Sequence, residues 1–263
     1  MNNIQIVTDF DRTLTKAVVN GKPGACSYGV IENSGLLSAD YHKKIKECYD
    51  YYFPIEIDPH KTIQEKVPFM VEWWVKANGA LVNEKISVSL FDTMIPKANL
   101  GFRVGVHQFL EFTEKNSLPV LVFSAGVGDL IDKIFVYLEG RLHSNLHVIS
   151  NRIITDSNGT ITGWKDPMIH VFNKNEVALS HDSSSSWFES VSHRKNLILI
   201  GDSPGDVGMA NGVVDPGEIL KIGFFNFDDP VALEKYKTLF DVLILNDGSF
   251  KFVLDLLNDI SAS

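Results

Sequence analysis

The sequence predicts an α/β protein with a doubly wound parallel sheet as its core and a helical domain inserted near the N-terminus. Short apolar runs alternate with helix-like segments along most of the chain, which is the pattern of strands and crossover helices. Residues 17–97 interrupt this alternation, because they contain amphipathic helical patterns and almost no strand-like runs. A length of 263 residues exceeds the usual size of one domain and leaves room for such an insertion.

Six short apolar runs have the composition of buried parallel strands: Ile4–Thr8, Val120–Phe123, His147–Ser150, Leu197–Ile200, Ile219–Phe224 and Val242–Leu245. Helices are expected between and after them, at Gly105–Lys115, Gly128–Leu138, Asn175–Val191, Asp206–Asn211, Pro230–Leu239 and Ser249–Ile260. A local hairpin is expected from Arg152–Thr155 and Thr160–Trp164, around Ser157-Asn158-Gly159. We therefore assign residues 1–16 and 98–263 to the core.

The insertion, residues 17–97, is predicted to be a helical cap. Its helical patterns lie at Ala39–Tyr52, Thr62–Asn78 and Asn83–Phe91. It begins directly after the first strand and its loop, so we expect it to lie over that loop like a lid.

Composition limits the partners of the protein. A net charge of −9 without any basic run argues against a nucleic-acid polymer or an anionic membrane. Only Cys26 and Cys48 are present, which suits a reducing compartment. With no leader pattern and no apolar stretch near the roughly 20 residues of a membrane span, we expect a cytoplasmic protein. The sequence does not reveal the oligomeric state, and we expect a monomer.

The first predicted strand ends in two carboxylates, Asp9 and Asp11. The carboxyl edge of a parallel sheet is where open α/β folds bind their ligands. One aspartate of such a pair can attack as a nucleophile while the other transfers protons. An Asp-rich turn is the alternative interpretation.

Two further strands also end in polar residues, at Ser124 and at Asp202 with Asp206. The small residues after Ser124 would expose backbone N–H groups to an anion, although a serine here could simply cap the next helix. Asp202 could likewise belong to an Asx turn. Because strand ends converge, Asp9, Asp11 and Asp202 together offer the oxygen ligands that Mg²⁺ prefers, completed by waters and a substrate phosphate. Lys174 is the best-placed cation for that phosphate, although a surface lysine is the ordinary interpretation.

These four motifs, in this order, resemble the haloacid dehalogenase-like phosphohydrolase superfamily. Longer runs are similar to the cytosolic 5'-nucleotidase III family of pyrimidine and 7-methylguanosine monophosphate nucleotidases: Pro54–Pro59, Met70–Trp74, Phe123–Asp129, His170–Lys174 and Leu220–Gly223. The resemblance covers nearly the whole chain and implies a Rossmann-like core with a helical cap inserted after the first motif.

The resemblance implies roles for the residues of the four motifs. Asp9 would be the nucleophile that forms an aspartyl-phosphate, and Asp11 the acid and then the base. Mg²⁺ would be held by Asp9, the backbone carbonyl of Asp11 and Asp202. The phosphate would be held by Ser124, the N–H of Ala125 and Lys174, with Thr13 and Asp206 as supporting residues.

Substrate choice is assigned to the cap. By resemblance, Glu56 hydrogen-bonds the nucleobase. Tyr28 and Trp74 would stack on it, and two aromatic faces favour the cationic 7-methylguanine. Either Trp73 or Trp74 could face the pocket, the other packing in the cap. The expected substrates are cytidine and 7-methylguanosine monophosphates. Ala77 stands where relatives can carry a hydroxyl that touches the methylated base, which weakens the case for strict preference.

Three alternatives remain at this stage. A phosphatase of another small metabolite, such as phosphoserine, would share the four motifs, but residues 17–97 contain no arginine to bind a small polar substrate. A binding protein without activity would have lost Asp9 or Asp11, and both are present. Phosphotransfer to a nucleoside would use the same aspartyl-phosphate.

Overall fold

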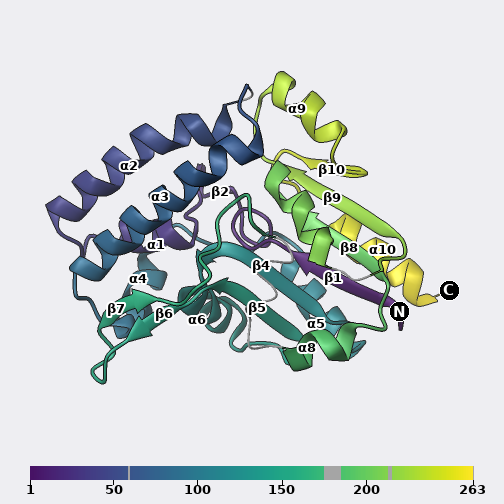
Figure 1. Cartoon of the computed structure of the whole chain (residues 1–263). Coiled ribbons are helices and arrows are strands. Elements are labelled where there is room, and N and C mark those ends of the chain that lie inside the picture. The colour runs from purple at the N-terminus through teal and green to yellow at the C-terminus, as the bar shows by residue number, and fades with distance from the viewer. Residues whose placement is uncertain (59, 175–184, 213–214, 263) are drawn as a thin grey trace.

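The core of the protein is a six-stranded parallel sheet. The computed structural model describes residues 1–58, 60–174, 185–212 and 215–262. The strand order is β10-β9-β8-β1-β4-β5 (Figure 1). The strands are β1 (Ile4–Thr8), β4 (Val120–Val127), β5 (Leu146–Asn151), β8 (Asn196–Gly201), β9 (Ile219–Phe225) and β10 (Val242–Leu245). The predicted parallel sheet is confirmed.

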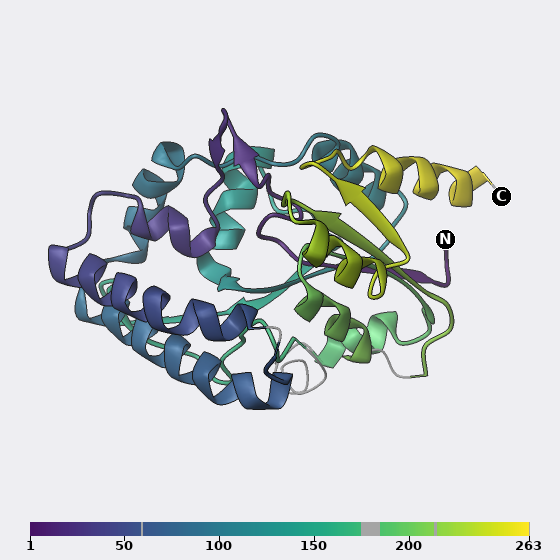
Figure 2. The same cartoon turned by 90° about the horizontal axis from the view of Figure 1, so that it is seen from above.

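Successive strand residues enter two different hydrophobic clusters, because side chains alternate across a sheet. Ile6 of β1 packs in a large cluster with helices α5 (Val106–Lys115), α6 (Gly128–Glu139) and α10 (Lys251–Ala262). Val7 packs in a second cluster with η3 (Pro204–Gly212), α8 (Ser185–Val191) and α9 (Pro230–Lys237). Both faces are therefore covered, as Figure 2 shows, and the strands are apolar on both sides as in other parallel sheets.

Between β1 and α5 the chain is mainly helical, with α1 (Ser27–Glu32), α2 (Ala39–Ile57), α3 (Ile63–Asn83) and α4 (Phe91–Met94). It also contains a hairpin of two short strands with two residues each, β2 (Val18–Val19) and β3 (Lys22–Pro23). Ser38 caps α2, and Thr62 with Glu65 forms a capping box at the start of α3. The two long helices α2 and α3 lie side by side in both views (Figures 1 and 2).

The predicted helix over Asn83–Phe91 is wrong. Helix α3 ends at Asn83, Lys85 takes a left-handed φ of 50°, and only a 3₁₀ turn, η1 (Val88–Leu90), precedes α4. The reason is that the Ile86 carbonyl accepts from the Ile161 N–H at 2.9 Å, beside a bridge between Ser87 and Thr160. This backbone pairs with the hairpin of β6 (Ile153–Thr155) and β7 (Ile161–Trp164) and is not free to be helical.

Two other predicted helices differ from the observed elements. The segment predicted as a helix over Asp206–Asn211 lies in η3 and is a 3₁₀ helix. The helix predicted over Asn175–Val191 is found from Ser185, as α8, and its first part lies outside the described residues. A second 3₁₀ turn, η2 (Ile95–Lys97), leads back from α4 towards the core. Among the described residues, no helix has the length and apolarity needed to cross a membrane.

Candidate active site

Asp9 lies immediately after β1, the central strand that pairs with both β8 and β4. Its predecessor Thr8 is in register with Ile200 and Val122, and the Asp9 N–H donates to the Ile200 carbonyl at 2.9 Å. The Asp9 side chain is almost fully buried. Two neighbouring strands therefore fix this carboxylate at the carboxyl edge of the sheet.

Asp202 and Asp206 come from the loop that follows β8. One oxygen of Asp206 accepts from the Asp202 N–H at 3.1 Å and from the N–H and hydroxyl of Ser203, both at 2.9 Å. The loop closes tightly enough that a Cβ on Gly201 would lie 2.5 Å from the Cβ of Asp206. Only glycine fits at that position, and the closed loop directs both carboxylates toward Asp9.

Lys174 connects the two carboxylate loops. Its Nζ donates to Asp9 Oδ1 at 2.5 Å and to Asp206 Oδ1 at 2.8 Å, and its side chain is 5% exposed. The segment before it is fixed by local hydrogen bonds, since the His170 N–H donates to the Asn173 amide oxygen and His170 Nδ1 accepts from the Phe172 N–H. His170 itself is buried, which lowers its pKa to about 4, and it serves this loop as a neutral acceptor.

Three carboxylates meet beside Lys174. Asp9, Asp202 and Asp206 each offer one oxygen, and these oxygens lie within 4.8 Å of one another. Oxygen donors at this spacing fit a hard divalent cation. The cluster contains Asp9 and Asp202 of the predicted metal set and adds the carboxylate of Asp206.

The electrostatics of the cluster favour an added positive charge. Burial raises the pKa of Asp9 to about 7, and the Lys174 charge offsets burial only in part. Burial and the charge of Asp9 raise the pKa of Asp202 well above its usual range. Burial alone would lower the pKa of Lys174, but the charges of Asp206 and Asp9 outweigh it and raise that pKa. One ammonium leaves negative charge uncompensated, which a divalent cation would neutralise.

Asp11 points away from this cluster toward the insertion. Its two oxygens accept from the N–H and the hydroxyl of Ser27, at the start of α1, both at 2.8 Å. Burial raises the pKa of Asp11, and the Ser27 hydrogen bonds oppose this rise only in part. The two aspartates after β1 thus have different environments, and coordination of a cation by the Asp11 backbone carbonyl stays a prediction.

Ser124 lies where β4 loses register with β5, between Phe123 and Val127. Its hydroxyl accepts from the Gly126 N–H at 3.1 Å. A Cβ on Gly126 would lie 2.1 Å from the Ser27 hydroxyl and 3.1 Å from both an Asp11 oxygen and the Ser124 hydroxyl. The glycine therefore allows the strand end, α1 and the loop after β1 to approach one another.

Glu56 lies near the end of α2. The buried Lys66 donates to its backbone carbonyl at 2.7 Å and places its ammonium 5.6 Å from the Phe172 ring centre. Burial raises the pKa of the Glu56 carboxyl to about 7, and the charges of Lys66 and Arg12 counteract this only in part. A carboxyl from the insertion and an arginine from the loop after β1 therefore lie within electrostatic reach of each other.

The two adjacent tryptophans of α3 have different surroundings. Trp73 stacks on Tyr52 of α2, with ring centres 5.8 Å apart and planes 17° apart. Trp74 directs its indole N–H at the Ala125 carbonyl, 3.4 Å away, near the end of β4 and next to Ser124. Trp73 thus packs within the insertion, whereas Trp74 meets the candidate site.

Tyr28 lies on α1 and contacts a different part of α3. Its hydroxyl donates to the Asn78 side chain at 3.0 Å, and its ring lies 6.4 Å from that of Trp164. The Trp164 N–H donates to the Asn78 carbonyl at 3.3 Å. A nucleobase stacked between Tyr28 and Trp74 stays a prediction.

Comparison with known proteins identifies the family. The family model described as pyrimidine 5'-nucleotidase (UMPH-1) matches residues 12–261. The human 7-methylguanosine phosphate-specific 5'-nucleotidase is 36% identical over 259 residues, which cover 98% of this chain and 85% of the human one. The chain belongs to the pyrimidine 5'-nucleotidase family.

Other relatives agree with this assignment. The 7-methylguanosine phosphate-specific 5'-nucleotidase of Drosophila melanogaster is 35% identical over 257 residues, covering 97% of this chain and 79% of that protein. The crystal structure of cytosolic 5'-nucleotidase IIIB bound to cytidine matches with a TM-score of 0.86 and 33% identity, covering 99% of this chain and 87% of that chain. The family resemblance and the enzyme class, a 5'-nucleotidase, are confirmed.

A more distant match shows the fold alone. A substrate-bound phosphoserine phosphatase has a TM-score of 0.56 and 16% identity, with 97% of both chains covered. The Rossmann-like core is therefore shared beyond the nucleotidase family.

Sequence reasoning missed several polar residues beside the site. Arg103 is a buried arginine that donates to the Thr13 carbonyl at 3.0 Å, and Asn226 lies next to Asp202. Asn226 directly follows β9, and Asp247 follows β10 by two residues. The strand-end rule that selected Asp9 and Asp202 applies equally to these two positions and would have identified them.

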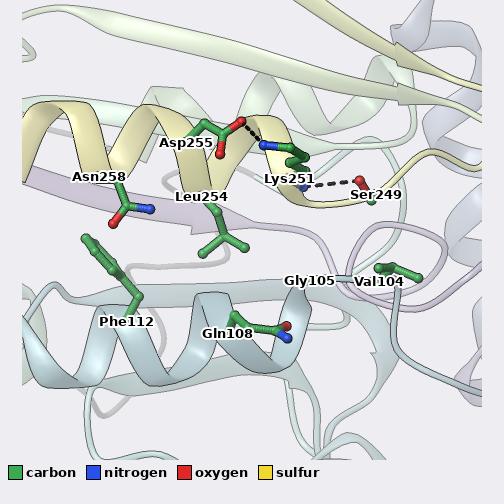
Figure 3. Close-up of a pocket in the computed structure, with 9 residues that line it drawn as sticks. All are labelled: Val104, Gly105, Gln108, Phe112, Ser249, Lys251, Leu254, Asp255 and Asn258. Carbon is green, nitrogen blue, oxygen red and sulfur yellow. Dashed lines mark hydrogen bonds and ion pairs between the residues drawn. The ribbon is translucent and has the colours of Figure 1, made fainter.

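A surface groove of about 450 Å³ lies away from the carboxylates, between α5 and α10 (Figure 3). Gln108 and Phe112 of α5 face Leu254 and Asn258 of α10 across it. Within the described chain, its lining includes none of the predicted site residues, and we assign it no part in the reaction.

Proposed function

We propose that this enzyme is a Mg²⁺-dependent nucleotidase that hydrolyses nucleoside 5'-monophosphates through an aspartyl-phosphate on Asp9. The observation that carries the proposal is the difference between its two strand-end aspartates. Asp9 lies in a cluster with Asp202, Asp206 and Lys174, whereas Asp11 is held separately by Ser27. This difference supports a nucleophilic role for Asp9, beside positive charge, and a separate proton-transfer role for Asp11.

In the first half-reaction, an oxygen of Asp9 forms a bond to phosphorus while the bond from phosphorus to the 5'-oxygen breaks. Asp11 gives its proton to the departing 5'-oxygen, and the nucleoside leaves. The raised pKa of Asp11 supports this role, because burial favours its protonated form. Lys174, Ser124 and the Ala125 N–H are the groups that would hold the phosphoryl oxygens.

In the second half-reaction, Asp11 removes a proton from water, whose oxygen attacks phosphorus. The bond between phosphorus and Asp9 breaks, phosphate leaves and both aspartates return to their starting states. The residues that would hold Mg²⁺ are Asp9, Asp202 and Asp206, directly or through water, with the Asp11 carbonyl. When bound, the cation would supply charge neutralisation, which favours ionised Asp9 and lets one anion attack another.

We infer that the insertion selects the base. Glu56 offers a carboxylate to the N–H donors of cytosine or 7-methylguanine, and Trp74 offers an aromatic ring beside Ala125. Relatives named for 7-methylguanosine phosphate and a relative bound to cytidine support both candidates. No nucleic-acid polymer or membrane partner is proposed.

The test is phosphate release from a panel of substrates with MgCl₂: cytidine, uridine, adenosine and 7-methylguanosine monophosphates, and phosphoserine. We expect the cytidine and 7-methylguanosine compounds to be the best substrates and Asp9→Asn to be inactive. Asp92→Asn, at an exposed aspartate of α4, is the matched control. Activity that survives Asp9→Asn would refute the nucleophile, and preference for phosphoserine would refute the substrate class. Adding a free nucleoside then measures the transferase share, as transferred phosphate per phosphate released.

A further inference from the structure

Arg103 is a buried charged residue whose hydrogen bonds are all made to the loops around the candidate site. Its side chain is fully buried, and its guanidinium lies 4.0 Å from the ring centre of Phe224. All of its N–H donors have acceptors, namely the carbonyls of Arg12, Thr13 and Gly248 and the side-chain oxygens of Asn226 and Asp247. A fully satisfied guanidinium of this kind holds its partners at fixed separations.

Asn226 extends this network to a carboxylate of the site. Its amide oxygen accepts from Arg103 at 3.2 Å, and its Nδ2 lies 3.1 Å from the Arg12 carbonyl and 3.5 Å from Asp202 Oδ2. The orientation of the amide follows from chemistry, because arginine only donates and the other two partners only accept. Arg103 thereby turns the NH₂ group of Asn226 toward Asp202.

The loop after Asp11 needs such support. Arg12 has a φ of 61°, in the left-handed region that non-glycine residues rarely occupy. Its carbonyl accepts from both Arg103 and Asn226, and its N–H donates to the Thr15 hydroxyl at 2.8 Å. Asn226 therefore contacts both loops that carry candidate ligands, the loop after β1 and the loop after β8.

We propose that Arg103 and Asn226 form a positioning pair, which sets the separation and orientation of the Asp202 carboxylate relative to the loop after β1. Neither residue is proposed to contact the substrate. Their contribution is made through Asp202 and the Arg12 carbonyl, and the inference rests on the proposed function, in which Asp202 is a ligand of the cation. Loss of the partner that orients a metal ligand typically weakens metal affinity by about 10- to 100-fold.

Asn226→Ala tests this role directly. Asn226 is only partly buried, so its truncation is compatible with folding. Arg103→Lys serves as a second variant, because it replaces the buried guanidinium and its paired N–H donors by a single ammonium. The matched control is Asn145→Ala, at an asparagine whose amide donates to the Leu118 carbonyl at 2.7 Å, in the loop before β5. Thermal unfolding and far-ultraviolet circular dichroism of each variant verify that it is folded.

The deciding measurement is Mg²⁺ binding by calorimetry without substrate, accompanied by the Mg²⁺ dependence of phosphate release. We expect Asn226→Ala to bind Mg²⁺ about tenfold more weakly and to need correspondingly more Mg²⁺ for activity, and Asn145→Ala to match the wild type. Unchanged Mg²⁺ affinity in folded Asn226→Ala would overturn the positioning role alone. Absence of Mg²⁺ binding to the wild type would overturn the proposed cofactor as well, so the two failures are distinguishable.

Discussion

The raised pKa of Glu56 makes a quantitative prediction about stability. Its carboxyl has an ordinary pKa of 4.5 and a pKa of about 7 in the folded protein, because burial disfavours the charged form. Replacing it by glutamine keeps the size of the side chain and removes the titration. A carboxyl with a raised folded pKa binds more protons folded than unfolded, so its ionisation destabilises the protein as pH rises from about 4.5 to 7.

The size of the effect follows from the separation of the two pKa values. At about 1.4 kcal/mol per pH unit, complete ionisation of Glu56 lowers the free energy of unfolding by at most about 3 kcal/mol. Between pH 5 and pH 8 the loss is about 2 kcal/mol, since part of the unfolded state is already ionised at pH 5. Glu56→Gln avoids this loss, so we expect the variant to gain stability relative to the wild type over that interval.

Urea unfolding at pH 5 and pH 8, followed by tryptophan fluorescence, measures the difference. Trp73 and Trp74 lie in the same insertion, so the signal reports on this part of the protein. Glu47→Gln is the control, because Glu47 is an exposed glutamate on the same helix. If the wild type and Glu56→Gln lose stability in parallel between the two pH values, the carboxyl is not held in a low-dielectric site and the reasoning fails.

Three further outcomes follow from the contacts described above. Gly126→Ala should destabilise the protein by about 1–3 kcal/mol in urea unfolding and lower kcat, because its Cβ would overlap the Ser27 hydroxyl; unchanged kcat would contradict this. Trp73→Ala should cost about 2 kcal/mol of stability, whereas Trp74→Ala should chiefly raise KM, and equal effects on KM would contradict this division. Chelation by EDTA should abolish phosphate release until Mg²⁺ is restored, and Asp206→Asn should raise the Mg²⁺ requirement about tenfold; activity that is indifferent to either would refute the cation site.

Much of the fold could be predicted because the strands are recognisable from their local sequence. The predicted runs at Ile4–Thr8 and Val242–Leu245 have the observed bounds, since strands of a parallel sheet are short, apolar and bounded by turn residues. The helix predicted over Asn83–Phe91 is wrong because its structure depends on a distant part of the chain. Its sequence has a local helical pattern. However, its backbone pairs with Ile161 and Thr160, more than 70 residues later in the chain. Hydrophobic periodicity carries no information about such a distant partner.

The site was only partly predictable from the same rules. Convergence of strand ends anticipated that Asp9 and Asp202 would meet, and the geometry brings them together. It did not anticipate which oxygens would be directed at each other. Asp206 is predicted only as a supporting residue, and the structure adds that its carboxylate joins the cluster and forms an ion pair with Lys174. That outcome depends on how tightly the loop after Gly201 closes, which is a property of three-dimensional packing.

The Arg103 network shows where prediction from one sequence ends. Arg103 and Asn226 are separated by 123 positions, and each alone resembles an ordinary polar residue beside an apolar run. Asn226 could be found by applying the strand-end rule to β9, because that rule depends only on topology. Arg103 follows no strand, and its burial is tolerable only because partners from the loops after β1, β9 and β10 together satisfy its donors. The free-energy cost of burying this charge is offset by hydrogen bonds from several distant segments. The role of such a residue becomes identifiable only in the folded structure, where those segments meet.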